Sequence, residues 1–360
     1  MCKHKPETLS EDVIAVNFDR PEKASIFDYF RSIELIPLET SPDVLIAYLS
    51  KVIVHEDKYY TFDKRQSIIN VFDETGKFLF KIDKKGQGFG EYNFIQDINI
   101  NPFSGNLELL EAYGAVHIFD LSGNYIEKKR IEYDDFAAVH MFAPVDQHTH
   151  VFYAMFEPEK IIYFNLDEKK LLHKEFEEDR ELATYAFNNL YPFLYEWFFF
   201  RPVHPVVYKI GRERLEPFFQ FDFGEYTRKG RTATFSEEAK RSLSKHRVEI
   251  FTQTSYVMTK VRHNKNYVLV ALLWKDADRT ANIVYDKSAG KSKFILDFDE
   301  KAAFEPDIVT DEYVLSICHW VDLEKFITKE MLDDTQKKIF EALVQSEDET
   351  NPILIKYWFK

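Results

Sequence analysis

The segment INVFDETGKFLFKI, residues 69–82, contains the pattern that decides the fold. It returns as VHIFDLSGNYIEKK at residues 116–129, where Phe119 repeats Phe72 after an interval of 47 residues. In both copies apolar and polar residues alternate on either side of a short turn, and the Asp and Gly of that turn supply the backbone conformations that a chain reversal needs. Each copy is therefore predicted to be a β-hairpin.

Three looser copies extend this repeat along the chain. They are IIYFNLDEKKLLHKEF from residue 161, VVYKIGRERLEPFFQF from residue 206 and NIVYDKSAGKSKFIL from residue 282. Another pair of strand-like runs lies upstream of each copy, for example LSKVIVHEDKYYTFD at residues 49–63. One repeat of about 45 residues thus holds four short strands, which is the size of a propeller blade. The sequence predicts an all-β fold, a six-bladed β-propeller of four-stranded blades.

Two stretches interrupt the repeat and are predicted to be helical inserts. The first lies near residues 226–251, because the interval from Tyr208 to Tyr285 exceeds one period by about 32 residues. It includes TFSEEAKRSLSKHRVEIF, which begins with a plausible capping box. The second lies near residues 321–346, inside the sixth blade, and carries apolar residues at helical spacing.

The two ends of the chain are predicted to complete one blade together. The sixth blade resumes as NPILIKYWFK at the C-terminus and lacks an outer strand. The run SIELIPLET, residues 32–40, can supply it and close the ring without leaving an open sheet edge. We therefore expect an N-terminal tether over residues 1–31 and a single propeller domain over residues 32–360.

Composition narrows the classes of function. Aromatic residues make up 16% of the 360 residues, which favours pleated and half-buried strands. The formal net charge of −14 opposes binding to a phosphate backbone, so nucleic acid is not expected as a partner. The longest nearly apolar run, YPFLYEWFFF at residues 191–200, contains a Glu and is too short to cross a bilayer as a helix.

The N-terminus MCKHKPETLSED raises the question of location. It carries no basic-then-apolar segment of the secretory type, so a literal interpretation with Met1 as the native start is cytoplasmic. A cysteine at the edge of a polar tether is also what a bacterial lipoprotein shows after its signal is removed, and this interpretation makes Cys2 the lipidation site. The preferred expectation is a cell-envelope lipoprotein, on the periplasmic or outer-membrane face, which touches the membrane only through that lipid.

Several segments together resemble a known family. These are IELIPLET, the run from LIAYLSKVIVHEDKYY to KKGQGFGEY in the first blade, and the closing EDETNPILIKYWFK. They are similar to six-bladed β-propeller lipoproteins of gut Gram-negative anaerobes, which are related to NHL-repeat propellers. The best marker resembles the family loop Gly-x-Gly-Pro-Gly-Glu-Tyr, here residues 86–92, with Phe89 in place of the proline. The resemblance runs from about Ile33 to Lys360 and implies an envelope location without a settled activity.

The glycine-rich loop of residues 84–94 could be mistaken for a phosphate site. A dinucleotide fingerprint needs its glycines between a strand and a helix, and a P-loop needs Gly-Lys-Ser/Thr at its end. This loop has neither feature and leads into another strand-like run, FIQDINI. We interpret the glycines as a bend between blades 1 and 2. Whether Glu91 and Tyr92 after this bend cap the next blade or touch a ligand is left open.

Catalytic and metal motifs are not found in the sequence. There is no Gly-x-Ser-x-Gly elbow, no His-Glu-x-x-His and no sialidase-type Asp box. His148-Thr149-His150 could pair two imidazoles, but it falls where blade 3 should turn and is interpreted as a solvated turn. No metal, no cofactor and no catalytic residue is therefore predicted, and enzymatic activity is left uncertain, with a preference for none.

Topology gives a better indication of a binding site than motifs do. Propeller ligands usually lie at the channel mouth, on the face where blade-to-blade loops and the central hairpin loops converge. Both helical inserts are expected on this face. The predicted ligand-binding residues combine arginines, aromatics and acids, which are materials for sugar recognition: Arg65, Glu91, Tyr92, Tyr113, Arg201, His204, Trp274, Arg279, His319 and Trp320, with Glu157 and Asp276 nearby.

Three functions remain open at this point. The preferred hypothesis is a non-catalytic envelope propeller that binds a glycan, peptide or protein partner at the insert-bearing face. The alternative is a glycoside hydrolase or lyase that uses Glu, His and Arg of the channel mouth. A third is a structural subunit of an outer-membrane complex. The identity of the ligand and the oligomeric state are not encoded in any motif of the sequence.

Overall fold

The computed structural model describes residues 12–111, 114–131, 139–154, 159–177, 189–233, 235–236, 238–239, 243–276, 278–346 and 349–360. Its contacts divide the chain into two compact units. Unit 1 contains Met1–Asp28 and Arg180–Glu312, and unit 2 contains Tyr29–Asp179 and Tyr313–Lys360. Each unit is described by itself below.

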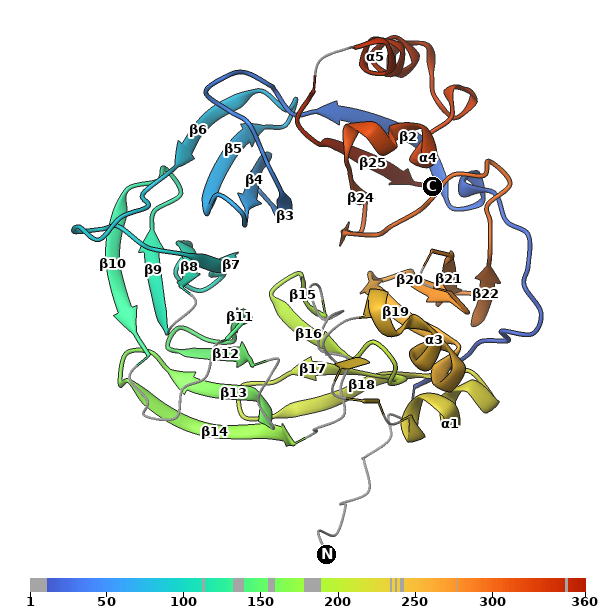
Figure 1. The fold of residues 1–360 in the computed structure, drawn as a ribbon, viewed down its shortest axis with the longest axis horizontal. Coiled ribbons are helices and arrows are strands. Elements are labelled where there is room, and N and C mark those ends of the chain that lie inside the picture. Colours follow the sequence, from blue (N-terminus) through green and yellow to red (C-terminus); the bar gives the residue numbers. More distant parts are fainter. Residues whose placement is uncertain are drawn as a thin grey trace, which may run out of the picture. The chain divides into compact units, whose positions relative to one another are not determined.

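The predicted six-bladed β-propeller is confirmed, with six antiparallel sheets of four blade strands each (Figure 1). Unit 2 holds blades 1 to 3. Blade 1 has β3 (Leu49–His55), β4 (Lys58–Asp63), β5 (Ile68–Asp73) and β6 (Phe78–Ile82); blade 2 has β7 (Ile95–Ile100), β8 (Leu107–Glu111), β9 (Ala115–Phe119) and β10 (Tyr125–Arg130); blade 3 has β11 (Met141–Pro144), β12 (Thr149–Tyr153), β13 (Glu159–Asn165) and β14 (Lys170–Glu177).

Unit 1 holds blades 4 and 5. Blade 4 has β15 (Leu190–Phe193), β16 (Glu196–Phe200), β17 (Val206–Ile210) and β18 (Leu215–Asp222); blade 5 has β19 (Tyr256–His263), β20 (Tyr267–Trp274), β21 (Thr280–Asp286) and β22 (Lys291–Ile295). The sheet of blade 4 gains a fifth strand, β1 (Val13–Ala15), which runs parallel to β18. The strands within each blade pair antiparallel with their neighbours, whereas β1 pairs parallel with β18.

The sixth blade is built from both ends of the chain, as the sequence predicted. Its strand order is β2 (Phe30–Pro37), β25 (Ile353–Phe359), β24 (Tyr313–Cys318) and β23 (Ile308–Val309). Within unit 2, β2 pairs antiparallel with β25 from Phe30 opposite Phe359 to Pro37 opposite Ile353. The alternation of buried Ile353, Ile355 and Tyr357 supplies the apolar face of the closing strand.

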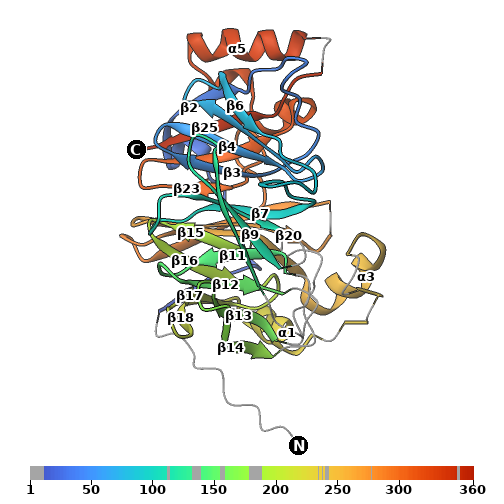
Figure 2. The ribbon, with the colours of Figure 1, turned by 90° about the vertical axis from the view of Figure 1, so that its left-hand side faces the viewer.

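Both predicted helical inserts are confirmed. In unit 1, α1 (Glu225–Thr232) and α3 (Leu243–Thr254) separate β18 from β19 and lie side by side (Figure 1). In unit 2, the segment between β24 and β25 contains η3 (Trp320–Asp322), α4 (Leu323–Phe326), η4 (Lys329–Met331) and α5 (Asp334–Gln345). Helix α5 lies beside β2 (Figure 2), where the Leu35 backbone N–H donates to Gln336 Oε1 at 2.8 Å.

The structure describes the N-terminal segment from Asp12 onward. The structure places β1, η1 (Ile26–Asp28) and the start of β2 within residues 12–31. Residues 1–11, with Cys2 among them, lie outside the described residues. The segment of residues 13–22, called the strap below, is part of unit 1 and forms one wall of the candidate site.

Candidate functional site

The strap forms a strand because its apolar residues alternate. Ile14, Val16 and Phe18 are buried, with 4%, 4% and 3% of their surface exposed, whereas Val13 is 50% exposed. Period-two burial is typical of a strand that has one face against a core. Pairing with β18 aligns Ile14 with Phe221, and the Val16 N–H extends the ladder by donating to the Asp222 carbonyl at 2.8 Å.

Phe18 anchors the strap in a socket of aromatic rings. Five rings surround it, with centroids 4.6 to 5.6 Å from the Phe18 centroid. Aromatic pairs at such distances stabilise by about 0.5–1.5 kcal/mol beyond the area they bury. The rings come from the β18–α1 turn, from α1 and from three strands of blade 5: Phe223, Tyr226, Tyr256, Trp274 and Phe294.

On both sides of Phe18 the strap also contacts β22, the outer strand of blade 5. The Glu22 N–H donates to the Phe294 carbonyl at 2.7 Å, and the Ser292 hydroxyl donates to the Ala15 carbonyl. Farther along, the Asp299 N–H donates to the Ala24 carbonyl at 2.9 Å. The strap therefore contacts the outer strands of both blade 4 and blade 5.

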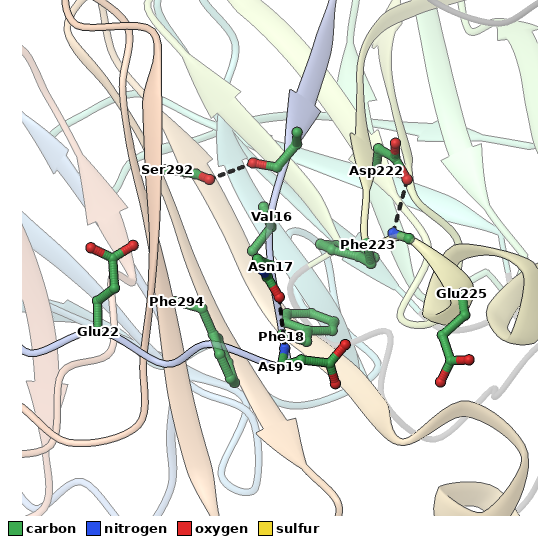
Figure 3. Close-up of a pocket in the computed structure, with 12 residues that line it drawn as sticks. Val16, Asn17, Phe18, Asp19, Glu22, Asp222, Phe223, Glu225, Ser292 and Phe294 are labelled. Carbon is green, nitrogen blue, oxygen red and sulfur yellow. Dashed lines mark hydrogen bonds between the residues drawn. The ribbon is translucent and has the colours of Figure 1, made fainter.

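A cavity of about 360 Å³ lies between the strap, the β18–α1 turn and β22. Figure 3 shows the strap crossing between Phe294 and the turn that carries Asp222 and Glu225. This volume is within the usual range for small-ligand sites. The lining combines apolar rings with acids: Ala15, Val16, Asn17, Phe18, Asp19, Glu22, Asp222, Phe223, Gly224, Glu225, Ser292 and Phe294.

Local hydrogen bonds position the acidic side chains. The Tyr226 hydroxyl donates to Asp19 Oδ1 at 2.9 Å, and burial followed by the Asp19 carboxylate raises the pKa of Tyr226. The Asp19 N–H donates to Asn17 Oδ1 at 3.0 Å. Asp222 Oδ1 accepts from the Gly224 N–H at 2.9 Å, where Gly224 has φ 62 and turns the chain into α1. Asp19 and Asp222 are thus oriented by the backbone and by Tyr226.

The charge of the cavity is one-sided. Asp19, Glu22, Asp222 and Glu225 supply four carboxylates, and none of the lining residues is basic. A neighbouring cation, Lys229, pairs with Glu225 at 3.1 Å from one turn along α1 and lies 4.7 Å from the Tyr226 ring centroid. Ionised carboxylates only accept hydrogen bonds, so the cavity is suited to a ligand that donates them.

The sequence-predicted site residues of unit 1 have different environments. Arg201 is 1% exposed and follows β16, and His204 is half-buried in the same loop. Trp274 is 3% exposed and packs behind the cavity against Phe18. Arg279 is exposed, and its backbone carbonyl accepts from the Trp274 N–H at 2.8 Å. The structure thus brings Trp274 next to the cavity, in its supporting core rather than in its lining.

The predicted residues of unit 2 lie in three loops. Arg65 is exposed between β4 and β5, and His319 and Trp320 are neighbours at η3 with ring centroids 6.3 Å apart. Glu91 and Tyr92 end the glycine-rich loop. Because the predicted residues divide between the two units, their convergence on one channel mouth stays a prediction.

Tyr92 is an internal support of the glycine-rich loop. It is 0% exposed, and its hydroxyl donates to the Ser67 carbonyl at 2.9 Å, next to the Ile82 carbonyl at 3.2 Å. Burial raises the pKa of the Tyr92 hydroxyl. Glu91 closes the bend by accepting the Gly88 N–H at 2.6 Å. Both side chains therefore hold the link from blade 1 to blade 2.

Two other predictions concern residues outside the cavity. Tyr113, Glu157 and Cys2 lie outside the described residues.

The interpretation of His148-Thr149-His150 as a solvated turn was wrong for its second half. His148 is in the turn and pairs with Asp167, but Thr149 begins β12 and His150 is 3% exposed. His150 Nε2 lies 2.7 Å from Glu108 Oε2, and this buried partner lets the strand start earlier than the sequence suggested.

The cavity residues themselves were not identified from the sequence. The sequence places the strap in the expected tether of residues 1–31, and neither Asp19 nor Glu22 is among the predicted site residues. The alternation of Ile14, Val16 and Phe18 is a strand signal that could have indicated a packed segment. Asp222 and Glu225 flank the first insert, but their partner wall lies about 200 residues earlier in the chain. No local motif connects such distant positions.

Comparisons with known proteins agree with the fold. A structure from Bacteroides fragilis, described as a "putative exported protein", has a TM-score of 0.71 and 14% identity, covering 97% of this chain and 99% of its own. A DUF4221 member from Bacteroides vulgatus has a TM-score of 0.56 and 10% identity, covering 92% and 97%. No curated protein matches the sequence. In the parts of the chain that the structure describes, no helix is long and apolar enough to cross a bilayer.

The family itself is identified by a match that covers nearly the whole sequence. The model of a domain of unknown function matches residues 11–357, so the strap, both inserts and all six blades except the last two residues of β25 fall within it. The chain belongs to the DUF4934 family.

Proposed function

We propose that this chain is a non-catalytic binding propeller whose ligand occupies the cavity between the strap, β22 and the start of α1. The ligand carries an amine, either on an amino sugar or on the side chain of a basic peptide. The observation that carries this proposal is the lining: four carboxylates around a floor of phenylalanine rings, without a basic side chain among them.

Charge and shape support an amine. A carboxylate forms its strongest hydrogen bonds with cationic donors, and the apolar part of the lining suits the carbons beside such a group. The site adjoins α1, the first helix of the first insert, and is lined from the outer strands β18 and β22, whereas the sequence hypothesis expects the ligand at the channel mouth. The overall charge of −14 also attracts a cationic partner at low ionic strength.

The proposal includes an envelope location with Cys2 as the lipid anchor. Its support is the position of this cysteine at the start of a polar segment. Growth of the native host with an alkyne-labelled fatty acid is expected to label the wild-type protein. The Cys2→Ser variant is expected to remain unlabelled. Labelling of this variant, or an unlabelled wild type, would contradict the anchor and leave the cavity proposal standing.

Matched probes test the ligand class. Glucosamine oligomers are compared with their N-acetylated forms, and a tetralysine peptide is compared with its acetyl-lysine counterpart, by isothermal titration calorimetry. Each acetylated form keeps the backbone of its partner and removes the positive charge. We expect at least one amine-bearing probe to bind more tightly than its acetylated partner, and the sugar and peptide arms distinguish the two sources.

Variants locate the site. Asp19→Asn keeps an oxygen that can accept from Tyr226 and removes the charge, and Glu225→Gln removes the next carboxylate. Each is expected to weaken binding roughly three- to tenfold, since one exposed ion pair contributes about 1 kcal/mol. Glu213→Gln, in the exposed β17–β18 turn, is the control and is expected to bind as wild type. Equal affinities for all four proteins would place the ligand elsewhere, and cleavage of a probe would indicate an enzyme.

A further inference from the structure

Blade 4 differs from the other five blades in its outer edge. In the described residues, β18 is the one outer strand that receives an additional strand, and β1 is parallel to it. No hairpin connects them, because β1 pairs with residues about 205 positions later in the chain, Val13 opposite Gln220. The strap therefore docks on blade 4 as a separate extended segment would.

The docked segment is recognised in the way that extended peptides are recognised. Main-chain hydrogen bonds join it to β18, including the Gln220 N–H to the Asp12 carbonyl at 2.9 Å. Side chains at alternate positions, Ile14, Val16 and Phe18, enter the core, and the exposed residues between them do not. Ladder bonds that are independent of sequence together with sockets for alternate side chains are the two components of strand-addition recognition.

Phe18 has the character of an anchor residue. It is 3% exposed and is enclosed by five aromatic rings. Buried aromatic anchors in preformed pockets contribute most of the binding energy in peptide interfaces. Each of the five rings also contacts another of them, for example Tyr226 with Trp274 at 5.5 Å, so the socket is supported from behind.

We propose that the β18 edge and this aromatic socket form a peptide-recognition groove of the strand-addition type, and that residues 13–18 are its resident peptide. The groove accepts an extended segment with apolar residues at alternate positions that end in an aromatic ring. When the resident segment leaves, another segment of this pattern can dock in its place. This inference does not depend on the ligand of the cavity.

Release of the resident segment is the first part of the test. Phe18→Ala is made in the full-length chain, and hydrogen exchange is followed at the Val16 and Glu22 amides, which are bonded to blades 4 and 5. We expect both amides to exchange at least tenfold faster than in wild type. The double variant Ile14→Asn, Val16→Asn removes the two other buried apolar side chains and is also expected to release the segment from blade 4. Val13→Asn, at an exposed position, is the control and is expected to keep wild-type protection.

Binding in trans is the second part. A fluorescein-labelled peptide DVIAVNFDRPE, residues 12–22, is titrated into each protein by fluorescence anisotropy. We expect it to bind the released variants at least tenfold more tightly than wild type, and the same peptide with alanine in place of its phenylalanine to bind none of them. Protected amides in both released variants, or released amides without peptide binding, would overturn the proposal. Glu225→Gln is expected to leave the exchange rates of the Val16 and Glu22 amides as in wild type. The test of the groove is therefore independent of the test for amine binding in the cavity.

Discussion

At the scale of single residues, two glycines allow the effect of a strained backbone on stability to be compared with the effect of a steric clash. Gly76 and Gly105 both lie in unit 2 with positive φ, 86 and 72. A Cβ at Gly76 would lie 2.4 Å from the Pro37 carbonyl oxygen, whereas one at Gly105 would meet nothing within 4 Å. Gly105→Ala is expected to cost about 1 kcal/mol of unfolding free energy from the left-handed backbone alone. Gly76→Ala is expected to cost a further 1–3 kcal/mol, since backbone cannot move aside easily.

Urea denaturation of the two alanine variants measures this difference. The Pro37 carbonyl belongs to β2, the strand that closes the sixth blade, so the larger loss reports on that closure. Equal losses for Gly76→Ala and Gly105→Ala would mean that β2 can shift away from the turn.

Glu111 makes stability depend on pH within unit 2. The hydrogen bond from His117 Nε2, at 3.1 Å, and then Lys128 hold the pKa of the Glu111 carboxyl well below its usual range, against the effect of burial. A depressed folded-state pKa stabilises the fold fully above the unfolded value of about 4.3, and this contribution is lost as the pH falls further. The melting-temperature difference between wild type and Glu111→Gln should therefore be largest above pH 5 and shrink towards pH 3.

The matched control for this titration is Glu168→Gln in an exposed turn of the same unit, which should show no such trend. A difference between wild type and Glu111→Gln that stays constant from pH 7 to pH 3 would refute the assigned pKa direction.

The sequence predicts the role of a single residue when that role follows from the local pattern, and not when it depends on a side-chain contact formed in the folded chain. It predicted the bend at residues 86–90 because glycines are local signals. It did not indicate that Glu91 would occupy the space beside Gly86, where an added Cβ would lie 2.0 Å from the Glu91 carboxylate. That contact depends on how the side chain folds back, which composition and spacing do not encode.

At the scale of elements, helix α5 depends on its first residues. Asp333 accepts from the Thr335 and Gln336 N–H groups, both at 2.9 Å, whereas the Asp334 side chain is 99% exposed. Asp333→Ala is expected to lower the local opening free energy of α5 by about 1 kcal/mol, since two N–H groups lose their cap. Asp334→Ala should lower it by only a few tenths. Hydrogen exchange at the Thr335 and Gln336 amides measures both, and equal effects would show that the cap does not limit opening.

At the scale of elements, a bulge and an ion pair also repeat between blades, in addition to the hairpins that the sequence predicts. In unit 2, β3 bulges before Lys51, the Ser50 hydroxyl donates to the Phe62 carbonyl at 3.1 Å, and Lys51 pairs with Asp97 at 2.8 Å. In unit 1, β19 bulges in the same way before Lys260. The Thr259 hydroxyl donates to the Ala271 carbonyl at 3.0 Å, and Lys260 pairs with Asp307 at 2.7 Å. Bulges redirect side chains, so this shared ion pair could not be found from alternation, which assumes an unbroken strand.

At the scale of the whole molecule, the repeat was enough to predict the blades but not the cavity. Hairpins, inserts and the pairing of β2 with β25 follow from local alternation and from counting one period after another. The cavity needs Asp19 on the strap, Asp222 at the end of β18 and Phe294 on β22, which belong to three different parts of the chain. Their meeting is set by tertiary packing around Phe18, and one sequence carries no signal for it.

The most direct test of the account is calorimetric titration of the strongest amine-bearing probe into wild type, Asp19→Asn, Glu225→Gln and the control Glu213→Gln. We expect the wild type and the control to bind alike, the acetylated probe to bind more weakly, and each cavity variant to lose roughly three- to tenfold in affinity. Equal affinity of all four proteins for the probe, or tighter binding of the acetylated form, would contradict the claim that this cavity is an amine-binding site.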